Sequence, residues 1–107
     1  MPPSETVIEI MYDKHLDAFS DEVAEVIYSK DRSMRYVVLK RDDGLLTYQL
    51  EAIYQFDEDE WRYICSSDNA LPAMWEPFRE CDGKSLFGSM EELRKEMMNE
   101  PEYKQYF

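Results

Sequence analysis

The chain has 107 residues, of which 44% are hydrophobic and 14% are aromatic, and its formal net charge is −12. This length suits one hydrophobic core, and the aromatic content is too high for a disordered chain. No window approaches the ~18 uninterrupted apolar residues of a membrane helix, and residues 1–12 lack the basic start and apolar core of a signal peptide. We therefore expect a single cytoplasmic domain over residues 1–107 that does not bind membranes.

The negative charge is spread unevenly along the chain. Residues 30–41 carry five basic side chains and one acidic side chain, whereas residues 42–60 carry seven acidic side chains and no basic one. Nucleic-acid affinity depends largely on Lys and Arg side chains that displace counterions, and the small basic cluster is enclosed by acids. The charge pattern therefore argues against nucleic-acid binding and favours a basic protein partner.

The N-terminal segment has the features of a helix that begins near residue 5. Thr6 and Glu9 have the spacing of a capping box, in which each side chain bonds a backbone donor at the helix start. An apolar stripe at helical spacing follows and consists of Ile8, Met11, Tyr12, His15, Leu16 and Phe19. His15 lies at the edge of this stripe, so we expect a partly buried histidine.

Four strands are expected next, because the following runs are rich in β-branched and aromatic residues. Residues 23–28 and 34–40 form the first two, and the turn pair Asp43-Gly44 leads into the clearest strand, residues 45–56, which alternates apolar and polar side chains. After the acidic turn of residues 57–60, the run WRYICS predicts a fourth strand. Together they form a meander.

The C-terminal part is expected to be helical. Ser89 and Glu92 form a second capping-box pattern, and the apolar spacing continues until Pro101, which can start a last helical turn. The order of elements predicts an α+β fold, in which an antiparallel four-stranded meander sheet carries an N-terminal helix and C-terminal helices on one face.

The segment from Leu71 to Phe78 is harder to assign. It is apolar and aromatic, but Pro72 and Pro77 argue against a regular strand or a long helix. One interpretation is a core lid in which Trp75 and Phe78 plug an open end of the sheet. The other is a recognition loop, because Trp, Met and Arg are enriched at protein interfaces. We favour the lid.

No catalytic, cofactor or metal motif is found. His15 is the only histidine, and together with Cys65 and Cys81 it does not provide the four closely spaced ligands of a structural zinc site. The two cysteines are expected to be ordinary free thiols. The acidic turn lacks the ligand spacing of an EF-hand, and the three glycines form no phosphate-binding loop. We therefore expect no cofactor, no metal and no enzymatic activity.

The leading functional hypothesis is a non-enzymatic protein interaction module for a basic partner. Inhibitors and immunity proteins that neutralise basic enzymes are similar in size and charge, which is an analogy only. The candidate partner-binding residues combine the acid-rich turns with nearby aromatic anchors and are Asp42, Asp43, Asp57, Glu58, Asp59, Glu60, Trp61, Trp75, Phe78 and Arg79.

The alternative is an enzymatic or small-molecule-binding domain. It requires a pocket between the sheet and residues 71–78, lined by tyrosines among Tyr36, Tyr48, Tyr54 and Tyr63. We expect a monomer, because two chains of charge −12 repel each other. If a homodimer forms, residues 71–78 are its expected seam, and an edge strand such as residues 23–28 is a second route.

Overall fold

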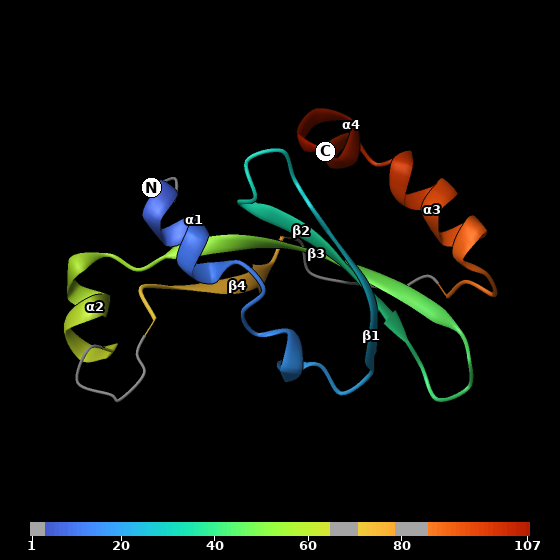
Figure 1. Cartoon of the computed structure of the whole chain (residues 1–107), viewed down its shortest axis with the longest axis horizontal. Helices are drawn as coiled ribbons and strands as arrows, with labels where there is room; N and C mark the ends of the chain where they lie inside the picture. The colour runs from blue at the N-terminus through green and yellow to red at the C-terminus, as the bar shows by residue number, and fades with distance from the viewer. Residues whose placement is uncertain (1–3, 65–70, 79–85) are drawn as a thin grey trace.

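The computed structural model describes residues 4–64, 71–78 and 86–107 and contains one antiparallel sheet (Figure 1). Its strands, in spatial order, are β1 (Glu22–Tyr28), β2 (Met34–Lys40), β3 (Leu46–Gln55) and β4 (Ala73–Pro77). The predicted α+β class and four-stranded antiparallel meander are confirmed, and the first three strands lie where they were predicted. The turn at Gly44 has a φ of 85°, a left-handed conformation that glycine adopts without strain.

The run predicted as the fourth strand is instead helix α2 (Glu58–Ile64). The backbone N–H of Glu60 donates to Oδ1 of Asp57 at 2.8 Å, and the backbone N–H of Asp57 donates to Oε1 of Glu60 at 3.2 Å. This reciprocal capping box, with acidic side chains in the first turn facing the positive end of the helix dipole, stabilises the helix. These helix-start interactions outweigh the strand preference of the aromatic residues that follow.

Strand β4 comes from the segment that was predicted to be irregular. Pro72 precedes its first residue and Pro77 is its last, so neither proline interrupts the middle of the strand. β4 also lies at an edge of the sheet and, in the described part of the chain, pairs only with β3. Prolines are tolerated at strand ends and on edge strands, which explains why the prediction was wrong.

The helical elements in the rest of the described chain are α1 (Glu5–Met11), a short 3-10 helix η1 (Leu16–Ala18), α3 (Met90–Met98) and α4 (Pro101–Tyr106). Ser89 caps α3 as predicted, since its hydroxyl accepts a hydrogen bond from the backbone N–H of Glu92 at 3.2 Å. α1 begins where expected, but Ser4 rather than Thr6 is its cap and accepts from the backbone N–H of Val7 at 3.3 Å.

The predicted apolar stripe of the first helix ends at Met11. Asp13 and His15 adopt left-handed conformations with φ angles of 60° and 62°, which stop the helix. The backbone N–H of Asp13 donates to the hydroxyl of Tyr28 at 3.0 Å, and this bond holds the turn against β1. His15 is therefore exposed, and the prediction of a partly buried histidine was wrong.

The core consists of two clusters on opposite faces of the sheet. On one face, Leu93 and Met97 of α3 pack in a cluster with Leu50 of β3. On the other face, Met11 of α1 packs in a cluster with Ile53, also of β3. Leu50 and Ile53 point to opposite faces because side chains alternate along a strand and β3 pairs without a register shift. The helices were predicted on one face, whereas the structure places α1 on one face and α3 on the other.

A buried arginine connects α1, β2, β3 and β4. The side chain of Arg35 is fully buried, its Nε donates to Oε1 of Glu51 at 2.8 Å, and its Nη1 donates to the carbonyl of Lys14 at 2.9 Å. Its Cζ lies 4.1 Å from the ring centroid of Trp75. The indole Nε1 of Trp75 donates in turn to the carbonyl of Met11 at 2.8 Å. With 5% exposure, Trp75 is a core strand residue and not an irregular lid.

Candidate functional site

One end of the sheet keeps large apolar side chains exposed. Tyr54 of β3 and Met74 of β4 are register partners, and their side chains are 39% and 40% exposed. Phe78 follows β4, bonds its backbone N–H to the carbonyl of Leu50 at 2.9 Å and is 45% exposed. On this face, Leu93 and Met97 of α3 pack in a cluster with Leu46 and Leu50 of β3. Phe78 therefore lies beside this cluster, whereas Tyr54 and Met74 lie further along the two strands.

Three carboxylates accompany these apolar side chains. The hydroxyl of Tyr54 donates to Oε1 of Glu60 at 2.7 Å. The pKa of Tyr54 is raised above its ordinary value of 10.0, first by this hydrogen bond, then by desolvation and by the negative charges of Glu60, Asp57 and Glu76. In the described part of the chain, no Lys or Arg forms a salt bridge with these three carboxylates. We call Tyr54, Met74, Phe78, Asp57, Glu60 and Glu76 the acidic-aromatic surface.

The titration of Tyr54 tests this arrangement. Replacing Glu60 with glutamine removes the largest cause of the shift, so the pKa of Tyr54 should fall toward 10.0, and the tyrosine should ionise at a lower pH than in the wild type. NMR of the tyrosine ring as a function of pH measures the change. Asp59→Asn is the matched control, because Asp59 pairs with Arg62 at 3.8 Å and does not contribute to the shift. An equal fall in both variants would contradict the proposed contact.

The structure divides the predicted partner-binding residues into two groups. Asp57 to Glu60 lie at the start of α2, whereas Asp42 and Asp43 lie in the turn between β2 and β3, at the opposite end of β3 (Figure 1). A ten-residue strand spans roughly 30 Å, so these two groups of acids do not form one surface. Asp43 also pairs with Arg41 at 3.2 Å.

The aromatic candidates are divided as well. Phe78 belongs to the acidic-aromatic surface, and Trp61 is exposed on α2. Trp75 points to the opposite face of the sheet and is buried, so its ring is not available to a partner in this structure. Arg79 lies outside the described residues. Sequence reasoning missed Met74 and Glu76, whose alternation with Trp75 becomes informative only when residues 73–77 are assigned as a strand.

The tyrosines of the alternative hypothesis do not converge on Trp75. Tyr36 and Tyr48 contact each other with their ring centroids 5.6 Å apart, and Tyr36 belongs to the α3-side cluster. Trp75 belongs to the cluster on the other face, and Tyr63 is 84% exposed. In the part of the chain that the structure describes, these three tyrosines therefore do not lie together with Trp75.

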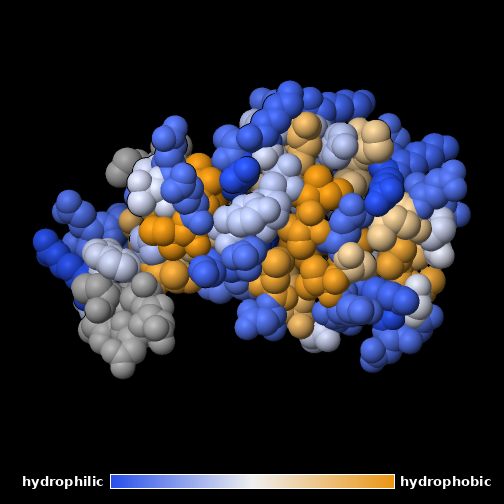
Figure 2. Space-filling model, in the orientation of Figure 1, coloured by the Kyte–Doolittle hydropathy of each residue, from blue (hydrophilic) through white to orange (hydrophobic). Residues whose placement is uncertain are grey.

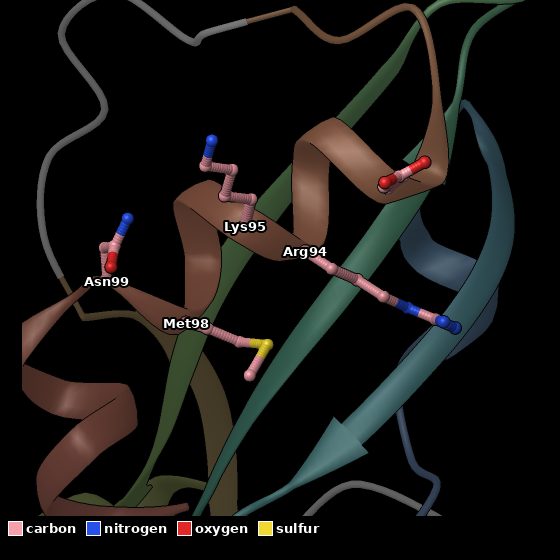
Figure 3. A pocket seen from close by; sticks show the side chains of 5 residues that line it. Arg94, Lys95, Met98 and Asn99 are labelled. Atoms are coloured by element: carbon pink, nitrogen blue, oxygen red, sulfur yellow. The ribbon is translucent and has the colours of Figure 1, made fainter.

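An open groove of about 570 Å³ lies along α3 (Figure 3). Its lining comes from one side of the helix and consists of Glu91, Arg94, Lys95, Met98 and Asn99. No group of three or more His, Cys, Asp or Glu side chains is placed to hold a metal ion in the part of the chain that the structure describes. Cys65 and Cys81 lie outside that part.

The helices of residues 4–64 and 86–107 are short, and none is long and apolar enough to cross a membrane. The surface features described above are the acidic-aromatic surface, the groove along α3 and the edge strands of the sheet.

Comparisons with protein-family models, with curated proteins and with solved structures gave no match.

Proposed function

We propose that this protein is a non-enzymatic interaction module that binds a basic protein through the acidic-aromatic surface. The observation that carries the proposal is that Tyr54, Met74 and Phe78 remain 39–45% exposed on one sheet face beside carboxylates that no described Lys or Arg neutralises. Aromatic residues and methionine are enriched in the centres of protein interfaces, where a few such side chains supply much of the affinity.

The charge distribution supports a basic partner. The net charge of −12 attracts a cationic protein over a distance of about a Debye length and raises the association rate. At contact, Glu60, Asp57 and Glu76 can accept hydrogen bonds from Arg or Lys side chains, while an apolar side chain of the partner covers Met74 and Phe78. The partner we propose is a cytoplasmic protein whose binding patch has an apolar centre and a basic rim, such as the basic enzyme that an inhibitor or immunity protein neutralises.

Affinity capture with matched variants tests the proposal. Met74→Ser removes an apolar side chain from the acidic-aromatic surface, and Met98→Ser removes a similarly exposed one from α3. For a basic protein captured by the wild type, calorimetric titration should show at least about tenfold weaker binding to Met74→Ser, since losing ~1.4 kcal/mol of a central contact has this effect. Met98→Ser should bind like the wild type.

The charge contribution is tested separately. Glu60→Gln with Glu76→Gln removes two charges at the surface, and Asp42→Asn with Asp43→Asn removes two at the far end of β3. The first pair should slow association and reduce its salt dependence more than the second pair. Glutamine still serves at the capping-box position of α2, so the helix is retained. Equal binding by all variants, or capture of acidic proteins only, would refute the proposed function.

A further inference from the structure

Two aromatic rings meet at the end of the acidic-aromatic surface that contains Tyr54. The ring centroids of Tyr54 and Phe56 lie 5.8 Å apart and the ring planes are inclined by 78°, so the two rings form adjacent walls of a corner. Tyr54 is exposed and Phe56 is half-buried, and both lie where β3 ends and the chain leads into α2. The face of an aromatic ring carries a negative potential, so rings in this arrangement attract a cation.

The carboxylate of Glu60 is fixed beside the tyrosine ring. Its Oε1 accepts hydrogen bonds from the hydroxyl of Tyr54 at 2.7 Å and from the backbone N–H of Asp57 at 3.2 Å. In the described part of the chain, its Oε2 has no hydrogen-bond donor and no Lys or Arg within ion-pair distance. Figure 2 shows hydrophilic residues over α2, the helix that carries Glu60. One carboxylate oxygen therefore remains available to a ligand beside the ring.

The core of the same chain shows how a ring and a glutamate hold an arginine. Cζ of Arg35 lies 4.1 Å from the ring centroid of Trp75, while its Nε donates to Oε1 of Glu51 at 2.8 Å. The planar guanidinium stacks on a ring and bonds a carboxylate at the same time. Tyr54 and Glu60 supply the same two components near the surface, but no Arg or Lys of the described residues lies over the ring of Tyr54.

We propose that an arginine side chain of the partner binds in the corner between Tyr54 and Phe56 and donates a hydrogen bond to Oε2 of Glu60. This inference rests on the proposed function and specifies the chemistry of the partner's basic rim. A guanidinium is planar and carries five donors in a fixed fork, so it can stack on the ring and reach the carboxylate together, whereas the compact, strongly hydrated ammonium of lysine cannot span both. The negative charges of Asp57 and Glu76 act on the same site and favour a cationic ligand.

Peptides of equal charge test the choice of arginine. Tetra-arginine and tetra-lysine amides are titrated into the protein at physiological ionic strength, and the NMR shifts of the backbone amides of residues 54–60 give the dissociation constants. Tetra-arginine should bind the wild type at least about threefold more tightly, since only the guanidinium gains the ring contact and the carboxylate together. Tyr54→Leu should abolish this preference. Tyr63→Leu is the matched control, because it deletes a more exposed tyrosine from α2, and it should retain the preference.

A second measurement uses the wild type alone. Stacking on an aromatic ring shifts the side-chain protons of a bound arginine upfield, so the δ-methylene protons of tetra-arginine should move upfield on binding, and the corresponding protons of tetra-lysine should not. Equal affinities of the two peptides for the wild type, the absence of an upfield shift, or an arginine preference that survives Tyr54→Leu would overturn the inference. Circular dichroism checks that both variants fold.

The arginine site and the proposed function can fail separately. If a captured basic protein binds less tightly to Met74→Ser but equally well to Tyr54→Leu and the wild type, the proposed function is supported and the arginine site is refuted. If the preference for tetra-arginine is present and is lost in Tyr54→Leu, but only acidic proteins are captured, the arginine site is supported and the proposed function is refuted.

Discussion

Replacing Glu51 with leucine should lower the free energy of unfolding by about 3–5 kcal/mol, because removing one member of a buried ion pair leaves an uncompensated buried charge. The guanidinium of Arg35 is fully buried and would keep only the Lys14 carbonyl as a hydrogen-bond acceptor among the described residues. Its Nη2 is buried and has no acceptor in the described part of the chain even in the wild type. Urea denaturation monitored by circular dichroism measures the loss.

The double variant Arg35→Met with Glu51→Leu is the control. Removing both charges removes the unpaired guanidinium, so the double variant should be more stable than Glu51→Leu alone, although it lacks one more native side chain. Arg35 also packs against the ring of Trp75, and methionine retains part of that apolar contact. If the two variants were equally unstable, the charge of Arg35 would not be the cause, and loss of packing around Glu51 would explain the result instead.

The pairing of Arg35 with Glu51 across β2 and β3 could have been predicted from the sequence. The tight turn around Gly44 was correctly predicted, and the hairpin register follows from it, because residues at equal distances from the turn face each other. Arg35 and Glu51 are such a pair. From the sequence, Arg35 was considered only as one of the five basic side chains of residues 30–41. The depth of its burial could not be predicted, since it depends on Trp75 and the Lys14 turn, which are distant in sequence.

The errors around α2 and β4 have different physical origins. Asp57 and Glu60 have capping-box spacing, so the start of α2 was visible in the sequence but was interpreted as an acidic turn. For β4, Pro72 and Pro77 argue against a strand when the sequence is considered alone. Proline disrupts a central strand, but it is tolerated at the ends of a strand and on an edge strand. Strand order is a tertiary property, and residues 73–77 alone do not reveal it.

The candidate site was predictable only in part. Asp57, Glu60 and Phe78 were expected to contact a partner. The structure places Asp57 and Glu60 beside Tyr54, whereas Phe78 lies further along β3, where its backbone N–H bonds to the carbonyl of Leu50. Asp42 and Asp43 were expected to belong to the same binding surface, but the ten residues of β3 separate them from Asp57 and Glu60. The separation follows from strand length, which was predicted correctly, so the two acidic groups could have been recognised as distinct from the sequence.

Replacing Trp75 with alanine should lower the free energy of unfolding by about 3–5 kcal/mol, the range for deletion of a large buried aromatic side chain. Trp75 is 5% exposed and packs in a cluster with Val7, Met11, Ile53 and Ala73. The substitution opens a cavity between α1 and the sheet, leaves the carbonyl of Met11 without its indole donor, and exposes Arg35 to the cavity. Urea denaturation measures this loss as well.

Two variants separate the contributions to this loss. Trp75→Phe keeps an aromatic ring beneath Arg35 but removes the N–H that bonds the Met11 carbonyl, so it should cost about 1–3 kcal/mol and less than alanine. Trp61→Ala deletes the exposed tryptophan of α2 and should cost no more than about 1 kcal/mol. If Trp75→Ala were no more harmful than Trp61→Ala, Trp75 would not be a core residue. If the expected order holds, weaker partner binding by Trp75→Ala follows from unfolding of the sheet, and Met74→Ser is the variant that reports on the surface itself.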